Sequence, residues 1–172
     1  NARILVFTGA RQVGKTTLVK KMLPDFAYLN IEDPVQRKTY AALTAQQWQH
    51  LYPHAILDEV QKEPQLIESI KATYDTYTDV RYLLLGSSQL LLLEKVKESL
   101  TGRCVIIEMY PLTLPELRTT TWQTDTPYSP WQALLRTPMD EPVFFPNFFL
   151  DPKNAEKAAA WAHYLRYGAY PA

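Results

Sequence analysis

Near the start of the chain, two glycines and the residues after them have the types and spacing of a loop that holds phosphate. Gly9 and Gly14 belong to a G-x-x-x-x-G-K-T pattern that ends in Lys15 and Thr16. Glycines let the backbone curl so that successive N–H groups point at phosphate oxygens. The lysine ammonium reaches the β- and γ-phosphates, and the threonine hydroxyl is a hard oxygen ligand for Mg²⁺. The pattern therefore predicts a site for ATP and Mg²⁺, made by Gly9, Ala10, Arg11, Gln12, Val13, Gly14, Lys15, Thr16 and Thr17.

Two neighbouring acids, Asp58 and Glu59, follow an apolar run at residues 54–57. At the end of a buried strand, the aspartate would hold the magnesium ion directly or through water. The glutamate, one residue further on, is placed to accept a proton from an attacking water molecule. Such a pair is a weak signal alone, because surface acids often follow strands. Downstream of a phosphate loop, it predicts the metal-binding and base residues of an ATP-hydrolysing site.

Two further residues are candidates for the catalytic set. Ser87 follows the fourth apolar run, and it would fall between the phosphate loop and Asp58 if that strand lies between the first and third strands. There it would touch the γ-phosphate or the water; the alternative is that Ser87 and Ser88 cap the next helix. Arg103 would neutralise transition-state charge as an arginine finger. The alternative for Arg103 is a solvated cation just beyond the end of a helix.

These candidates require a parallel sheet with crossover helices, and the chain alternates short apolar runs with helical patterns accordingly. We predict strands at residues 4–7, 26–31, 55–57, 80–85 and 105–109, and helices at 15–23, 35–43, 90–100 and around Leu66, Ile67, Ile70 and Tyr74. The fourth strand shows no alternation of apolar and polar residues, as expected when helices cover both faces of the sheet. The predicted fold class is therefore α/β, a three-layer sandwich of the P-loop NTPase type.

A change of composition beyond Leu117 divides the chain into a core at 1–117 and a second region at 118–172. The prolines of the second region break regular elements, whereas its aromatic residues argue against a solvated linker. We expect an irregular region packed on the core, with a short helix at 131–136 and an alanine-rich helix at 154–166. Packing is favoured over base stacking for the aromatic residues, because few cations accompany them.

Charge and composition restrict the partners and the compartment. The 18 Lys and Arg residues balance the 18 Asp and Glu residues, so no net field favours nucleic acid or an anionic membrane. No run approaches the roughly 20 apolar residues of a transmembrane helix. The single cysteine, Cys104, has apolar neighbours, which indicates a buried strand thiol and fits a reducing, cytoplasmic compartment. The three histidines show no metal-ligand spacing, so a zinc site is not expected.

With these elements in place, the chain resembles the AAA+-type ATPases of bacteria and archaea in which a P-loop domain precedes a C-terminal domain of obscure function. The matching stretches are TGARQVGKTT (8–17), LDEVQK (57–62), LGSS (85–88), ESLTGR (98–103) and YPL (110–112). The resemblance implies a five-stranded, mostly parallel sheet with the P-loop strand central and a site for ATP and Mg²⁺. It also implies an arginine finger at Arg103, through which copies of the chain would associate.

The end of the chain also resembles this family. Residues 168–171 are similar to a Gly-Gly-aromatic-Pro signature after which relatives continue, so we expect a truncated chain. Two positions depart from the family pattern. Leu85 stands where threonine is expected before the Gly-Ser-Ser turn, which weakens a sensor role there and leaves Ser87 as the one serine candidate. Ala169 replaces a glycine of the terminal signature.

Three other functions compete with ATP hydrolysis. A GTPase would need Asp-x-x-Gly after the third strand, where residues 58–61 read Asp-Glu-Val-Gln. A P-loop kinase for a small metabolite shares the phosphate loop but needs an arginine-bearing lid, and the acid pair favours water as the acceptor. A nucleotide-gated switch or scaffold uses the same residues, since ATP would order an interface and slow hydrolysis would reset it. We expect hydrolysis in this chain to be slow if Arg103 and a missing C-terminal part complete the site.

Overall fold

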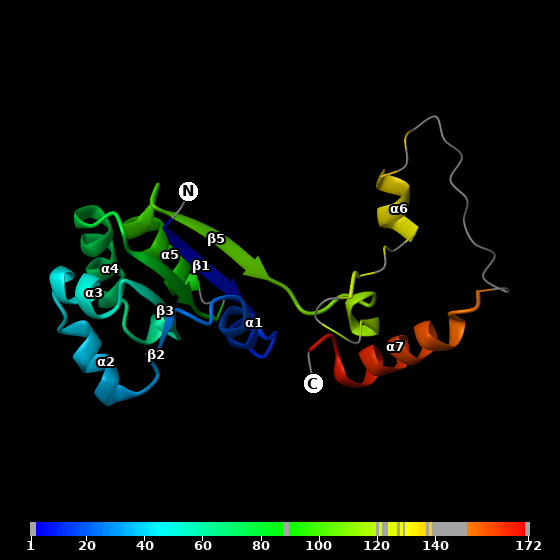
Figure 1. The fold of residues 1–172 in the computed structure, drawn as a ribbon. Helices are drawn as coiled ribbons and strands as arrows, with labels where there is room; N and C mark the ends of the chain where they lie inside the picture. Colours follow the sequence, from blue (N-terminus) through cyan, green and yellow to red (C-terminus); the bar gives the residue numbers. More distant parts are fainter. Residues whose placement is uncertain are drawn as a thin grey trace. The chain divides into compact units, whose positions relative to one another are not determined.

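A computed structural model of the chain describes residues 3–87, 90–119, 121, 124–126, 128, 130–136, 138 and 151–170. The chain divides into two units, Asn1–Tyr110 and Pro111–Ala172. The first unit contains a five-stranded sheet (Figure 1), with strands β1 (Ile4–Gly9), β2 (Ala27–Asn30), β3 (His54–Asp58), β4 (Arg81–Leu85) and β5 (Cys104–Met109).

The strands of this sheet are parallel throughout and lie in the order β2-β3-β4-β1-β5. The α/β fold with a five-stranded parallel sheet is therefore confirmed, and β1 is an interior strand paired with β4 and β5. Strand β4 lies between β1 and β3, which is the arrangement that the expected position of Ser87 requires. Because all strands run the same way, their C-terminal ends meet at one edge of the sheet.

Helices cover both faces of the sheet, which makes the three expected layers (Figure 1). Side chains alternate between the faces along each strand. In β1, Ile4 and Val6 join a large core under four helices, whereas Phe7 joins a smaller core under α1. The smaller core is covered by α1 (Lys15–Met22), and the larger by α2 (Pro34–Ala41), α3 (Ala45–Leu51), α4 (Gln65–Thr76) and α5 (Leu90–Leu100).

Helix α3 lies in a stretch, between residue 43 and β3, for which the sequence patterns predict no element. It begins with a capping box, in which the Thr44 hydroxyl accepts a hydrogen bond from the Gln47 backbone and the Gln47 side chain accepts one from the Thr44 backbone. Its one buried residue, Trp48, is fully buried and packs against the rings of Tyr40, Tyr52 and Tyr82. The helix is too short for its sequence to show a clear hydrophobic period. Packing of the Trp48 indole in the core stabilises it.

Strand β5 corrects the expectation that Cys104 is a buried strand thiol. It forms the edge of the sheet, and its central side chains are exposed: Val105 by 46%, Ile106 by 40% and Ile107 by 43%. Cys104 is half-buried, and burial raises the pKa of its thiol. An apolar run alone does not distinguish an edge strand from a central one, because it does not say how many neighbours the strand has.

The second unit contains a 3₁₀ turn, η2 (Glu116–Arg118), and helices α6 (Pro130–Arg136) and α7 (Asn154–Tyr167), close to the two predicted helices. The backbone N–H of Leu112 donates to the carbonyl of Ala169 at 2.8 Å, and Arg118 pairs with Glu156 at 3.4 Å. These contacts join residues 111–118 to α7 and to Ala169 just beyond it. Residues 111–117, which we expected in the first region, thus lie in the second unit. The proline- and aromatic-rich stretch 139–150 lies outside the described residues, and packing of the second region on the core stays a prediction.

None of the described helices combines the length and the apolar character that crossing a membrane requires.

Replacement of Trp48 by alanine should lower the free energy of unfolding by about 3–5 kcal/mol, because it removes a fully buried aromatic ring and leaves a cavity. Urea unfolding measures this loss. Leu51→Ala, on the same helix but at an exposed position, is the matched control and should change stability by less than about 0.5 kcal/mol. Equal losses for the two variants would contradict the assigned packing of α3.

Candidate functional site

The C-terminal ends of β1, β3 and β4 bring most of the predicted site residues together. Residues 9–16, called the glycine loop below, run from the last residue of β1 into the first turn of α1. Glu59 follows β3 directly, and Ser87 lies just beyond β4. This edge is where parallel α/β sheets bind their ligands, because the loops after the strands converge there.

The shape of the glycine loop depends on its glycines. Gly9 has a φ of 147°, and a Cβ there would lie 2.2 Å from the carbonyl oxygen of Met109 on β5. Gln12 and Gly14 both have positive φ values, 62° and 94°. Gly14 is also the N-cap of α1, where it offers no side chain to occupy the free N–H groups of the first helical turn. The loop therefore presents backbone donors and a helix dipole to an anion.

Lys15 is buried within this loop, with 9% of its surface exposed. Its ammonium donates hydrogen bonds to the carbonyls of Gly9 at 3.1 Å and Ala10 at 2.6 Å. Burial lowers its pKa below the ordinary value for lysine, whereas the charges of Glu59 and Asp58 act in the opposite direction. No carboxylate of the described residues pairs with this ammonium, which contacts two backbone carbonyls, and this suits it to bind phosphate.

The other residues of the predicted phosphate-binding segment, residues 9–17, differ in how deeply they are buried. Val13 is buried and anchors the loop in the protein. Arg11, Gln12 and Thr17 are exposed, and Ala10 is half-buried. The side chains of the exposed three point away from the core, so their expected contact with a nucleotide rests on the backbone or on side chains that turn toward it.

Thr16 and Asp58, the two expected metal ligands, are in direct contact. The Thr16 hydroxyl donates to Oδ2 of the Asp58 carboxylate at 2.8 Å, and the backbone N–H of Glu59 donates to Oδ1 at 2.9 Å. A hydroxyl and a carboxylate are the hard oxygen ligands that Mg²⁺ prefers. Glu59 adds a second acid beside Asp58, near the buried ammonium of Lys15. The donor set thus fits a magnesium ion.

Tyr28 on β2 joins this site, although no sequence pattern indicated it. Its hydroxyl donates to Oδ2 of Asp58 at 2.7 Å, and the Lys20 ammonium lies 3.4 Å from the centre of its ring. Burial and the hydrogen bond to Asp58 raise the pKa of Tyr28 well above the ordinary tyrosine value. The only available signal was strand register: Tyr28 pairs with Ile56, on the same face of the sheet as Asp58.

Glu59 occupies a left-handed backbone conformation, with φ 59° and ψ 38°, and its side chain accepts a hydrogen bond from Nε2 of Gln61. Non-glycine residues adopt this conformation rarely and at a cost, and they are concentrated at functional sites. Ser87 is buried and lies 3.4 Å from the same Gln61 nitrogen. Glu59 and Ser87 are therefore neighbours, connected by a glutamine that the sequence analysis did not select. The alternative that the serines cap α5 involves Ser88, which lies outside the described residues.

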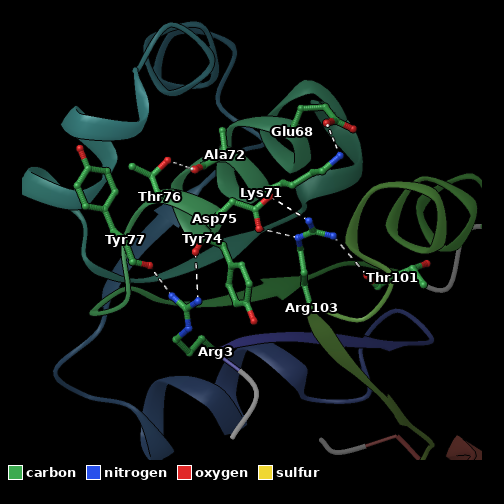
Figure 2. A network of polar contacts seen from close by, with 10 residues as sticks. All are labelled: Arg3, Glu68, Lys71, Ala72, Tyr74, Asp75, Thr76, Tyr77, Thr101 and Arg103. Atoms are coloured by element: carbon green, nitrogen blue, oxygen red, sulfur yellow. Dashed lines mark hydrogen bonds and ion pairs between the residues drawn. The ribbon is translucent and has the colours of Figure 1, made fainter.

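Arg103 does not join the other predicted residues within its own chain. It directly precedes β5, and the parallel pairing of β5 with β1 places it at the N-terminal ends of these strands. The glycine loop lies at their C-terminal ends. Figure 2 shows Arg103 turned toward Asp75 of α4, with two parallel hydrogen bonds of 2.7 and 3.0 Å. These bonds hold the pKa of the Asp75 carboxyl below its ordinary value. The Arg103 guanidinium thus lies at the opposite ends of the strands from the glycine loop.

A second arginine, Arg3, binds the end of α4 near Arg103, as Figure 2 shows. Arg3 donates to the backbone carbonyls of Tyr77 at 2.5 Å and Tyr74 at 3.1 Å, and its guanidinium lies 3.8 Å from the Tyr74 ring centre. These contacts join the start of β1 to the end of α4. The helix that carries Asp75 is thereby fixed against the sheet, and with it the position of Arg103.

The parallel sheet and the glycine loop between β1 and α1 define a nucleotide-binding α/β domain of the P-loop type. A family model described as an AAA domain matches residues 1–118, and the chain belongs to this family. It is thus an ATPase-type domain at the level of the family. The C-terminal domain of obscure function that the resemblance implied stays a prediction.

Two uncharacterised mycobacterial proteins are similar to the chain, one from Mycobacterium bovis and one from Mycobacterium tuberculosis. Each is 32% identical over 124 residues, which cover 67% of this chain and 27% of the relative. The chain therefore matches about a quarter of the length of these relatives. Their names assign no activity.

Replacement of Tyr28 by phenylalanine should lower the free energy of unfolding by about 1.5 kcal/mol, because it removes a hydrogen bond to a charged, buried carboxylate. The raised pKa of Tyr28 means that this contribution is fully present below the ordinary tyrosine pKa of about 10 and is lost as the pH rises through the folded-state value. Urea unfolding at neutral pH therefore measures all of it.

The matched control is Tyr110→Phe. Tyr110 also donates to a carboxylate, Oε2 of Glu108 at 2.9 Å, but it is exposed to solvent. Its loss should change stability by less than about 0.5 kcal/mol. A loss for Tyr28→Phe no larger than that of the control would contradict the role of Tyr28 at Asp58.

Proposed function

We propose that the chain binds ATP together with Mg²⁺ and hydrolyses the γ-phosphate. The observation that supports this most strongly is the contact of Thr16 with Asp58, because it joins the first turn of α1 to the end of β3 in one pair of oxygen ligands. The buried ammonium of Lys15 lies beside this pair. Membership of the AAA domain family points to the same chemistry.

In this proposal Lys15 releases the carbonyls of the glycine loop and binds oxygens of the β- and γ-phosphates. Glu59 accepts a proton from the attacking water as the water oxygen bonds to the γ-phosphorus. The bond from that phosphorus to the bridging oxygen breaks, and ADP leaves with the electron pair. Ser87 donates a hydrogen bond to the γ-phosphate or the water. A magnesium ion bound by Thr16 and Asp58 would neutralise phosphate charge throughout.

A second candidate function is a nucleotide-gated switch with little turnover. The position of Arg103 favours it, since this arginine is paired with Asp75 at the far edge of the sheet and cannot complete the site of its own chain. A single molecule would then bind ATP without rapid hydrolysis. Association through Arg103 would supply the finger to a neighbouring molecule and start turnover.

Lys15→Ala should weaken ATP binding at least about a hundredfold, because the variant loses charge-assisted hydrogen bonds that together contribute roughly 3 kcal/mol. Glu59→Gln should keep the affinity and slow turnover at least about a hundredfold, as expected for a lost general base. Isothermal titration with ATP and Mg²⁺, paired with a phosphate-release assay, measures both quantities. Lys38→Ala, at an exposed position on α2, is the control cation and should behave as wild type.

Equal ATP affinity of wild type and Lys15→Ala would overturn the assignment of the nucleotide site. Unchanged turnover in Glu59→Gln would leave the nucleotide site in place but remove Glu59 as the base.

If Arg103 acts on a neighbouring molecule, the hydrolysis rate per chain should rise with protein concentration, and Arg103→Ala should abolish the rise. A finger typically contributes about a thousandfold or more to kcat. Arg81→Ala is the matched control, because Arg81 is an exposed arginine that begins β4 at the same edge of the sheet. A rate that depends neither on concentration nor on Arg103 would contradict an arginine finger acting between molecules.

A further inference from the structure

The backbone after β3 turns so that the side chain of Gln61 comes back toward Glu59. Glu59, in its left-handed conformation, begins the 3₁₀ turn η1 (Val60–Lys62). The N–H of Lys62 donates to the carbonyl of Glu59 at 2.9 Å, and Val60 between them is fully buried. The buried valine anchors the turn in the core. The placement of Gln61 is therefore determined by packing and not by a mobile surface loop.

The side-chain amide of Gln61 connects two residues of the proposed catalytic set. Its Nε2 donates to Oε2 of Glu59 and lies 3.4 Å from Oγ of Ser87. An amide nitrogen has two hydrogens, so it can serve both oxygens at once. The orientation of the amide follows from charge, because the reverse orientation would place its oxygen against the Glu59 carboxylate.

The amide oxygen of Gln61 is buried and finds no hydrogen-bond partner among the described residues. A buried acceptor without a donor is destabilising, and native proteins keep such atoms rarely. The atom belongs to the same amide group that contacts Glu59 and Ser87.

We infer that Gln61 is a positioning residue for hydrolysis: its amide holds the Glu59 carboxylate toward the attacking water and joins it to Ser87. The inference rests on the proposed function, in which Glu59 is the base. Gln61 acts through Glu59 and does not itself take the proton. Removal of the amide should therefore slow the chemical step and leave nucleotide binding intact, since no contact of Gln61 reaches Lys15, Thr16 or Asp58 among the described residues.

A double-mutant cycle of Gln61 and Glu59 tests this. Gln61→Met keeps the size of the side chain and removes both hydrogen-bonding groups; it should lower kcat about tenfold, the effect of one hydrogen bond, and change KM for ATP less than about twofold. In the Glu59→Gln background the same substitution should have no further effect, because Gln61 acts only through the carboxylate. Gln65→Met, an exposed glutamine at the start of α4, is the matched control and should keep wild-type kcat.

The outcomes separate this inference from the function on which it rests. Wild-type kcat in Gln61→Met, a rise in KM in place of a fall in kcat, or an equal further loss in the Glu59→Gln background overturns the role of Gln61. Wild-type turnover in Glu59→Gln overturns the base assignment itself, and the inference with it.

Where turnover is too slow to measure, urea unfolding of the same chain provides a second cycle with Glu59→Ala, Gln61→Met and the double variant. The loss of unfolding free energy in the double variant should be smaller than the sum of the two single losses. The difference should correspond to about a factor of five in the unfolding equilibrium constant. Additive losses would show that the contact between Gln61 and Glu59 contributes no coupling energy, and would overturn the role of Gln61.

Discussion

The carboxylate of Asp58 is the group on which the rest of the site depends. It is buried at the end of β3 and accepts hydrogen bonds from Thr16 on α1, Tyr28 on β2 and the backbone of Glu59. These hydrogen bonds connect α1, β2 and the segment after β3 to the two oxygens of one carboxylate. The chain then turns at Glu59 into η1. A buried carboxylate needs such partners, because an unpaired charge in the interior is strongly destabilising. The same partners leave it well placed to hold a hard cation.

Charge balance supports the proposal that these residues bind a ligand. The edge carries the acids Asp58 and Glu59 against one buried ammonium, Lys15, which rests on the carbonyls of the glycine loop. An incoming triphosphate would satisfy the ammonium and the helix N-terminus, and a magnesium ion would satisfy the acids. Arg103, the expected arginine finger, lies at the opposite ends of the strands, paired with Asp75. In the proposed function, this division of charge separates nucleotide binding within one molecule from a completion step between molecules.

Sequence patterns predicted the parallel α/β fold and the strand ends that carry the glycine loop, Asp58 and Ser87, because these depend on local chemistry and on hydrophobic runs. They did not predict Tyr28 and Gln61. Tyr28 reaches Asp58 through the pairing of β2 with β3, and Gln61 reaches Glu59 through a left-handed turn at a non-glycine residue. Both contacts arise from tertiary geometry that a short motif does not encode. The exposure of β5 was missed for a related reason, since it follows from the position of the strand at the edge.

The most direct test of the proposed nucleotide site is a crystal structure of the chain with Mg²⁺ and an ATP analogue that cannot be hydrolysed. We expect the Lys15 ammonium to leave the carbonyls of Gly9 and Ala10 for oxygens of the β- and γ-phosphates. We also expect Thr16 and Asp58 to face the metal ion. A nucleotide bound elsewhere, or a Lys15 ammonium still on its two carbonyls beside a bound triphosphate, would contradict the proposed site.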